Sequence, residues 1–395
     1  MFETLKPQPE DKIIQLMASF RADPRPGKVD LGVGVYKDAS GNTPVMRAVR
    51  AATGRVTAAE TTKTYVALAG DAAFHGAMRQ LVLGDAVDAA RVAAVATPGG
   101  TGAVRIAADL IARSTPGATV WMSDPTWPNH PAIMQDLGLA TASYRYFDPA
   151  TGEVAFDAMM TDIAAIPDGD VVLLHGCCHN PTGANLTQAQ WGQLVDLLAG
   201  RRLTVLVDIA YQGFGDGLDE DAFATRLLAA RLPEVLVAAS CSKNFGVYRE
   251  RVGVLFAISQ PPIDAGVVQQ NLTALNRLNY SFPPDHGARL VQTVLDTPEL
   301  AADWRAEVEQ IRTSMLALRA DLAAELRRLT NSDRFDFVAR HRGMFSLLGL
   351  TPEQVDRLRE HHAIYMVGDS RINVAGLNPA SVKLLAAGIA AVLQD

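Results

Sequence analysis

Five short apolar runs that alternate with amphipathic stretches constrain the fold of this chain more than any other feature. The runs are residues 119–122, 171–174, 203–207, 234–238 and 252–258. Continuous apolar runs of this length suit strands that are covered on both faces, as in a parallel sheet. The stretches between them, such as 187–198 and 221–232, have helical periodicity. We therefore predict an α/β layer with a mostly parallel sheet.

The pattern changes after residue 297. From Pro298, apolar residues recur at spacings of three and four, which places them on one helix face for about 30 residues. These residues are Leu300, Trp304, Val308, Ile311, Met315, Leu318, Leu322 and Leu326. A coiled coil has a similar pattern, but the compact α/β character elsewhere favours one long helix that crosses between domains. The rest of the C-terminal part has the pattern of a smaller α+β unit.

The composition is that of an ordinary globular protein. At 395 residues the chain is long enough for two or three structural units, and its net charge of −7 gives no basic surface for nucleic acid or an anionic membrane. Its three cysteines are too few for a disulfide framework, which favours a reducing compartment. The N-terminus lacks an apolar signal segment, and no apolar run is long enough to span a membrane. We therefore expect a cytoplasmic protein.

Lys243 lies directly after a predicted buried strand. Partial loss of hydration lowers the pKa of such a lysine and makes its neutral amine available for Schiff-base chemistry. Ser240 and Arg251 flank it with a hydroxyl and a planar bidentate donor, a pair suited to a phosphate group. A solvated loop lysine is the common alternative, but the flanking donors shift the balance toward a functional site.

The segment 97–102, with the sequence TPGGTG, is a second candidate for phosphate binding. Its glycines let backbone N–H groups approach an anion, and the predicted helix that follows adds partial positive charge at its N-terminus. Neither the dinucleotide nor the nucleoside-triphosphate fingerprint is met. An ordinary tight turn between strand and helix is an equal alternative.

Asp208 ends another predicted buried strand, and Tyr211 follows it. Burial disfavours an ionised carboxylate, so Asp208 needs a partner. A helix N-cap is the common explanation, and a protonated pyridine nitrogen is the more specific one. Arg371, late in the chain, is a planar donor that can hold a carboxylate, although a surface arginine is the simpler interpretation.

The sequence HGCCHNPTG at residues 175–183 has two histidines and two cysteines within five positions. This invites a zinc site. We reject it because adjacent cysteines point apart in an extended chain and no second ligand cluster follows, so we predict no metal site. Asn180-Pro181-Thr182-Gly183 is instead interpreted as a turn that orients the Asn180 amide.

Together these segments resemble the class I aminotransferases of the aspartate/aromatic subgroup, which have fold type I of the pyridoxal-phosphate enzymes. The resemblance extends over essentially the whole chain. The matching segments are DLGVGVYKD (30–38), TTKTYVAL (61–68), PGGTGA (98–103), SDPTWPNH (123–130), HGCCHNPTGA (175–184), VDIAYQGF (207–214), SCSKNFGVYRER (240–251), NYSFPP (279–284) and RINVAGL (371–377).

The resemblance implies pyridoxal 5'-phosphate as the cofactor and gives catalytic roles to three residues. Lys243 is expected to hold the cofactor as a Schiff base and to carry a proton between the substrate Cα and the cofactor. Asp208 is expected to keep the pyridine nitrogen protonated, with His130 orienting the carboxylate. Tyr211 is expected to donate to the ring oxygen.

The remaining cofactor contacts follow from the same resemblance. Asn180 also donates to the ring oxygen, and Trp127 stacks on the ring. Both residues also line the substrate site. The residues expected around the phosphate are Gly100, Thr101, Ser240, Arg251 and, from the partner subunit of a homodimer, Tyr65.

For the substrate, the resemblance implies that Arg371 binds the α-carboxylate and that Gly34 lies in a loop lining the same pocket. Arg277 is similar to a residue that the partner subunit directs toward a side-chain carboxylate. The implied layout places residues 1–45 in an N-terminal arm and part of a small domain. Residues 46–309 form the large cofactor domain, and residues 310–395 complete the small C-terminal domain.

The resemblance therefore implies a ping-pong transfer of an amino group from an amino acid to a 2-oxo acid, 2-oxoglutarate. The segments NYSFPPDHGA and YMVGDSRIN favour aromatic amino acids, with aspartate and glutamate also accepted, and aspartate aminotransferase is the alternative. Three rivals are a fold-type-I lyase or decarboxylase, a ligand-sensing module of a regulator, and a nicotinamide dehydrogenase. The pair Arg277 and Arg371 argues against a lyase or decarboxylase. We expect no DNA-binding domain, because there is no room for one before residue 30, which argues against a regulator. The missing dinucleotide fingerprint argues against a dehydrogenase.

Overall fold

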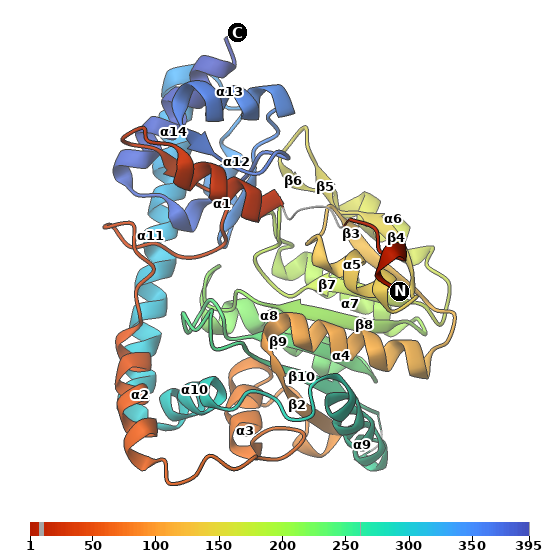
Figure 1. Ribbon diagram of the computed structural model, residues 1–395. Helices are drawn as coiled ribbons and strands as arrows, with labels where there is room; N and C mark the ends of the chain where they lie inside the picture. Colours follow the sequence, from red (N-terminus) through yellow and green to blue (C-terminus); the bar gives the residue numbers. More distant parts are fainter. Residues whose placement is uncertain (8–11, 261, 395) are drawn as a thin grey trace.

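The computed structural model describes residues 1–7, 12–260 and 262–394 (Figure 1). Its centre is a seven-stranded sheet in the order β2-β10-β9-β8-β7-β3-β4, in which β10 alone runs antiparallel to its neighbours. The strands are β2 (Val92–Pro98), β3 (Thr119–Asp124), β4 (Ala140–Arg145), β7 (Val171–His175), β8 (Thr204–Ile209), β9 (Val235–Ser240) and β10 (Val252–Ile258). The five predicted strands and the mostly parallel sheet are therefore confirmed.

Sequence patterning does not identify β2 and β4. β4 is an edge strand with mixed exposure along its length, so it has no apolar run. β2 is buried between β10 and the helices, but it is rich in alanine, which has low strand propensity, so its sequence does not indicate a strand.

Successive residues of the central strands face two different cores, as the pleat requires. In β7, Val171 and Leu173 belong to one apolar cluster, and Val172 and Leu174 belong to the other. The first face is covered by α4 (Gly99–Ser114), α5 (Asn129–Asp136) and α9 (Pro262–Asn279). The opposite face is covered by α2 (Arg47–Ala59), α3 (Ala72–Val82), α6 (Phe156–Ala164), α7 (Gln188–Ala199), α8 (Leu218–Arg231) and α10 (His286–Asp296). The sheet is therefore the middle layer of three.

Helix α11 (Pro298–Thr330) runs for 33 residues and confirms the predicted long helix. All eight apolar residues of the predicted stripe are buried. Those from Leu300 to Met315 join the core beneath the sheet, whereas Leu318, Leu322 and Leu326 join a second core. One helix therefore connects the two cores, as Figure 1 shows along its vertical course.

Most of the rest of the C-terminal part surrounds the second core, although Met344, Phe345 and Ala375 join the first. The elements of this part are α12 (Phe337–Arg340), β11 (Phe345–Leu347), α13 (Pro352–His362), β12 (Ile364–Tyr365), β13 (Arg371–Asn373), η3 (Val374–Gly376) and α14 (Pro379–Val392). The N-terminal strand β1 (Val29–Asp30) pairs with β12 and contributes Val29 to this core. The stretch from Asp23 to Lys37 thus packs on the C-terminal part of the chain. The division of the chain at residues 45 and 309 stays a prediction.

The smaller elements are η1 (Phe2–Thr4), α1 (Lys12–Ala22), η2 (Ala89–Arg91), β5 (Phe147–Asp148) and β6 (Glu153–Val154). Within the described ranges, no helix combines the length and the apolar character that crossing a bilayer requires.

Trp304 of α11 is fully buried and links this helix to the segment that carries Lys243. Its indole stacks on Phe245 with 4.4 Å between ring centroids, and its Nε1 donates to the Asn244 carbonyl oxygen at 2.7 Å. We expect Trp304→Ala to lower the free energy of unfolding by about 3–5 kcal/mol, since it leaves a large cavity and an unpaired carbonyl. Chemical denaturation measures this change.

The matched control is Gln310→Ala, at an exposed position of the same helix, which should change stability by less than about 0.5 kcal/mol. Equal effects of the two substitutions would contradict the assigned role of Trp304.

Candidate active site

The candidate site lies at the edge of the central sheet that is formed by the carboxyl ends of its parallel strands. Strands β2, β7, β8 and β9 all end at this edge, and β10 begins there, with Val252 opposite Pro98 and Gly253 opposite Ser240. Ligand sites in open α/β sheets form at the carboxyl ends of the strands, where loops diverge. This topology brings together segments that are far apart in the sequence.

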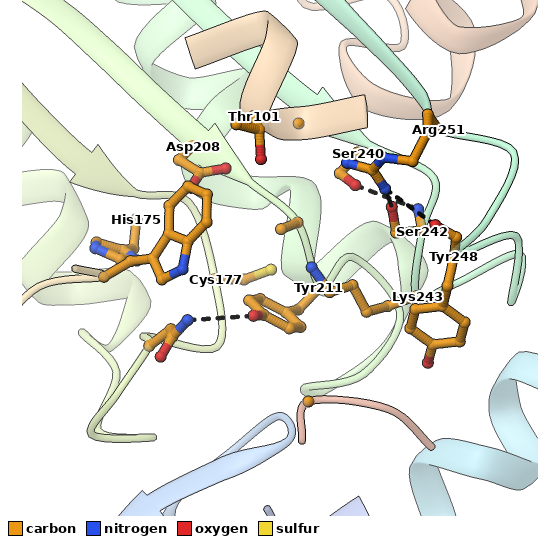
Figure 2. Close-up of a pocket in the computed structure, with 15 residues that line it drawn as sticks. Thr101, His175, Cys177, Asp208, Tyr211, Ser240, Ser242, Lys243, Tyr248 and Arg251 are labelled. Atoms are coloured by element: carbon orange, nitrogen blue, oxygen red, sulfur yellow. Dashed lines mark hydrogen bonds between the residues drawn. The ribbon is translucent and has the colours of Figure 1, made fainter. Parts of the chain in front are cut away.

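A cavity at this edge is lined by most of the residues predicted for the site (Figure 2). The predicted residues in its wall are Gly34, Gly100, Thr101, Trp127, Asn180, Asp208, Tyr211, Ser240, Lys243 and Arg251. Figure 2 shows Lys243 between Tyr211 and the group formed by Ser240, Ser242 and Arg251. The structure therefore assembles these residues in one place.

Lys243 follows β9 and directs its amine into the cavity. The pKa of this amine is lowered to about 8, chiefly by desolvation in the surrounding protein, with the negative charge of Asp208 opposing the shift and Arg251 contributing to it. The amine lies 4.8 Å from the centroid of the Tyr211 ring. A substantial neutral fraction of the amine is therefore present near neutral pH, as nucleophilic or proton-transfer chemistry requires.

Asp208, near the end of β8, pairs with the fully buried His130. His130 Nε2 lies 3.0 Å from Asp208 Oδ2, and His130 Nδ1 lies 2.9 Å from Thr126 Oγ1. Burial alone would raise the pKa of Asp208, but the contact with His130 outweighs it and the pKa is lowered. The carboxylate is thus ionised in the cavity. A helix cap is the wrong explanation for Asp208, because Gly217 is the N-cap of the next helix, α8.

An anion-binding cradle lies on the opposite side of Lys243. The N-terminus of α4 presents Gly100 and Thr101 to the cavity, next to Ser240 and Arg251. The Arg251 guanidinium packs so close to Gly99 that a Cβ there would lie 2.4 Å from Arg251 Nη2. Backbone N–H groups at a helix N-terminus together with a guanidinium and hydroxyls favour a phosphate group.

Arg371 of β13 is buried at the boundary of the two cores. Its guanidinium donates to the Gly32 carbonyl oxygen at 3.1 Å and to Asn180 Oδ1 at 3.4 Å, and it lies 4.4 Å above the Phe345 ring. Its Nε has no hydrogen-bond partner among the described residues. Neither of the two acceptors is a carboxylate, so the guanidinium retains unused capacity for an anionic ligand. The interpretation of Arg371 as a surface arginine is wrong.

Tyr65 and Arg277 lie outside this cavity. Tyr65 is 77% exposed and stacks on Phe282 with 4.5 Å between ring centroids. Arg277, at the end of α9, is exposed and donates to Ser281 Oγ at 3.1 Å. The single chain therefore does not bring these two residues to the site, and their roles stay predictions.

Sequence reasoning assigned no role to several residues that the structure places here. Ser242 and Tyr248 line the cavity and accept hydrogen bonds from Arg251, at the Ser242 hydroxyl and the Tyr248 carbonyl. The Phe345 ring packs against the Arg371 guanidinium. Ser242 and Tyr248 lie within the Lys243 segment, which was a usable signal, but nothing in the sequence around Phe345 indicated its position.

One premise of the sequence analysis is wrong. Cys178 has φ of 51°, so the chain is not extended there, and the sulfur atoms of Cys177 and Cys178 lie within 4.8 Å of each other and of an Asp221 carboxylate oxygen. Neither His175 nor His179 belongs to this group. Both thiols are free.

The family model described as aminotransferase class I and II matches residues 26–389. The chain belongs to this family. The aromatic-amino-acid aminotransferase of Paracoccus denitrificans is 58% identical to this aminotransferase over 98% of the chain and 99% of the relative. The aspartate aminotransferase of Escherichia coli is 42% identical over the whole of both chains.

Solved structures agree with this assignment. An aromatic amino acid aminotransferase with 3-indolebutyric acid matches this aminotransferase with a TM-score of 0.97 and 58% identity, covering 99% of this chain and 100% of the other. The aromatic-amino-acid aminotransferase of Burkholderia pseudomallei, covalently bound to pyridoxal phosphate, matches with a TM-score of 0.97 and 43% identity over 100% and 99% of the two chains. The expected fold type I is confirmed.

The lowered pKa of Lys243 gives a testable pH dependence. In the cofactor-free enzyme, an amine-reactive reagent should label Lys243 with a rate that rises with pH and levels off above about 8, since only the neutral amine reacts. Asp208→Asn should move this midpoint to lower pH, because it removes a negative charge that stabilises the ammonium form. Peptide mapping by mass spectrometry measures the labelling. An unchanged or higher midpoint in the variant would refute the coupling.

Proposed function

We propose that this aminotransferase transfers the amino group of an aromatic amino acid to 2-oxoglutarate, with pyridoxal 5'-phosphate as its cofactor, and also accepts aspartate and glutamate. The observation that carries the proposal is the Lys243 amine, screened from bulk water between an ionised carboxylate and an anion cradle. The aromatic relatives described above support the substrate class.

The donor set of the cavity fits this cofactor. Arg251, Ser240 and the N-terminus of α4 would hold the phosphate, and the Asp208 carboxylate would hold a proton on the ring nitrogen. When bound, the cofactor supplies an electron-poor ring that stabilises negative charge at the substrate Cα. The protein supplies binding, orientation and proton transfer.

Lys243 is the residue suited to move the proton at the substrate Cα. Its pKa of about 8 is close to physiological pH, which is favourable for a group that both accepts and returns a proton. Asp208 stays ionised through its contact with His130, so its carboxylate would hold a proton on the ring nitrogen of the cofactor. Tyr211 accepts a hydrogen bond from Asn180 Nδ2 at 3.4 Å, which orients its hydroxyl to donate to the ring oxygen.

Arg371 would bind the α-carboxylate of the substrate. Its Nε has no partner among the described residues, and its long hydrogen bonds to Asn180 and Gly32 leave N–H donors available for the carboxylate. Gly34, which has no side chain, leaves space beside Phe345 for the substrate. A Cβ on Gly34 would lie 2.8 Å from the Phe345 ring. Because Arg371 lies on β13, whose next residue Ile372 belongs to the second core, we propose that residues 1–45 and 310–395 move as a small domain against residues 46–309 when substrate binds.

We also propose a homodimer in which the partner subunit contributes to each site. Tyr65 and Arg277 are exposed and lie outside the cavity of their own chain, which suits residues that act on a neighbouring one. In this arrangement Arg277 pairs with the side-chain carboxylate of aspartate or glutamate. For an aromatic substrate it must move away, because an unpaired buried guanidinium costs several kcal/mol.

Lys243→Ala should abolish turnover, because the proton-transfer group is removed, while the cradle still binds the cofactor through its phosphate. Steady-state transamination and cofactor absorbance measure the two effects separately. The matched control is Lys383→Ala, an exposed lysine of α14 remote from the cavity, which should retain normal rates. Turnover of Lys243→Ala at the unsubstituted rate would overturn the assignment.

The substrate class is tested by a half-reaction titration of the holoenzyme without a 2-oxo acid, following cofactor absorbance. Phenylalanine should convert the cofactor to its aminated form about as readily as aspartate does. Conversion by aspartate with no conversion by phenylalanine would favour the second candidate function, aspartate aminotransferase. The 42% identity to the Escherichia coli enzyme supports this second candidate.

A further inference from the structure

A group of two thiols and a carboxylate lies behind the active-site cavity. Cys177 and Cys178 follow β7 directly, and Asp221 lies in the first turn of α8. The left-handed backbone at Cys178, with φ of 51°, folds two adjacent side chains toward the same side. As a result, one ligand atom of each of the three residues lies within 4.8 Å of the others.

This group is reachable from two cavities. Cys177 lines the active-site cavity, where Figure 2 shows its sulfur beside Tyr211. Cys177 and Asp221 also line a second cavity, together with Tyr146, Trp191 and Phe223. A small ion therefore has a route to Cys177 and Asp221, and Cys178 lies behind them as the buried member of the group.

A buried hydroxyl next to Gly176, the residue before Cys177, lacks a partner among the described residues. Thr225 is fully buried on α8, one turn after Asp221, and its Oγ1 has no hydrogen bond to any residue that the structure describes. This Oγ1 is 2.9 Å from the position a Cβ would take on Gly176, the residue before Cys177. An unpaired buried hydroxyl is costly unless a ligand, or water held by a ligand, satisfies it.

We propose that Cys177, Cys178 and Asp221 form a binding site for a thiophilic divalent cation of the zinc and cadmium class. Two sulfur ligands at about 2.3 Å from a tetrahedral zinc ion lie roughly 3.8 Å apart, so the ligand atoms, which lie within 4.8 Å of one another, need to approach by at most about 1 Å. Thiolate ligands select such metals over magnesium or calcium. Three protein ligands leave the fourth position open to the cavity.

Backbone N–H groups fix the orientation of the Asp221 carboxylate. Its Oδ2 accepts backbone N–H groups from Gly213 and Gly215, each at 2.8 Å, and its Oδ1 accepts that of Asp216 at 2.9 Å. A carboxylate has about four acceptor positions, so Oδ1 retains one for a metal. Groups that orient a ligand in this manner strengthen metal binding.

Binding exchanges protons for the ion. Both cysteines are free thiols, and each carries a proton on its sulfur before the ion arrives. One divalent ion forms two metal–sulfur bonds, and two S–H bonds release two protons to solvent. No oxidant or reductant takes part.

Occupation of the site should also inhibit the enzyme. Cys177 lies between His175 and Asn180, which both line the active-site cavity, so the ion would fix this segment. This consequence rests on the proposed function. Metal binding itself does not, so its measurement can fail or succeed independently of transaminase activity.

The test is a titration of the purified holoenzyme with Cd²⁺ in thiol-free buffer, following thiolate-to-cadmium charge-transfer absorbance in the ultraviolet. The signal should saturate at about one ion per chain, with about two protons released. Cys177→Ser and Cys178→Ser should each abolish the saturable signal, and Asp221→Asn should weaken binding at least about tenfold. The matched control is Cys241→Ser, which removes the buried cysteine beside Met78 and should leave the signal unchanged.

A measurement on the unsubstituted protein guards against variants that fail to fold. X-ray absorption of the cadmium-loaded holoenzyme should give two sulfur atoms in the first shell, with oxygen completing it. A shell of oxygen and nitrogen alone would overturn the proposal. So would a saturable signal that survives in both single cysteine variants, or no saturable signal in the unsubstituted holoenzyme.

Discussion

Desolvation of the Lys243 amine is the constraint on which the site depends. An ammonium group loses hydration when it is enclosed by protein, so its pKa falls. The structure limits this loss by placing the Asp208 carboxylate in the same cavity, and it keeps Asp208 ionised by contact with His130. The cationic cradle around Arg251 acts in the opposite direction. The opposing effects of Asp208 and Arg251, together with desolvation, set the pKa of Lys243 so that part of the amine is neutral and reactive near physiological pH.

The sheet topology makes this balance possible. Asp208 lies near the end of β8 and Lys243 follows β9, its parallel neighbour, so the two side chains start from the same end of the sheet. The antiparallel strand β10 lies between β2 and β9, and it therefore begins at that edge with Arg251 next to Gly99. A fully parallel sheet would have placed the start of this strand at the far edge.

Helix α11 joins this edge to the second core. Near its start, Trp304 contacts the Lys243 segment through Phe245 and Asn244. Further along, the fully buried Arg319 donates to the carbonyl oxygens of Gly343 and Phe345 at 2.8 and 2.7 Å. These bonds hold β11, whose Phe345 ring lies beneath Arg371. The lysine and the arginine of the site are thus positioned by opposite halves of one helix.

The sequence by itself determined the layer architecture and the long helix, because periodicity is a local property of the chain. It determined most of the cavity wall through the resemblance of whole segments to one family, with a local signal only where polar residues such as Lys243 and Asp208 follow or end a buried strand. Only the tertiary structure decided the contacts made by residues distant in sequence. Phe345 beneath Arg371 and the buried position of Arg371 depend on how the elements pack. The resemblance implied that His130 orients Asp208, and the packing sets their separation of 3.0 Å. The adjacent thiols of Cys177 and Cys178 show the same limit. Their convergence depends on a left-handed backbone at Cys178, which a non-glycine residue adopts only when the surrounding packing holds it there.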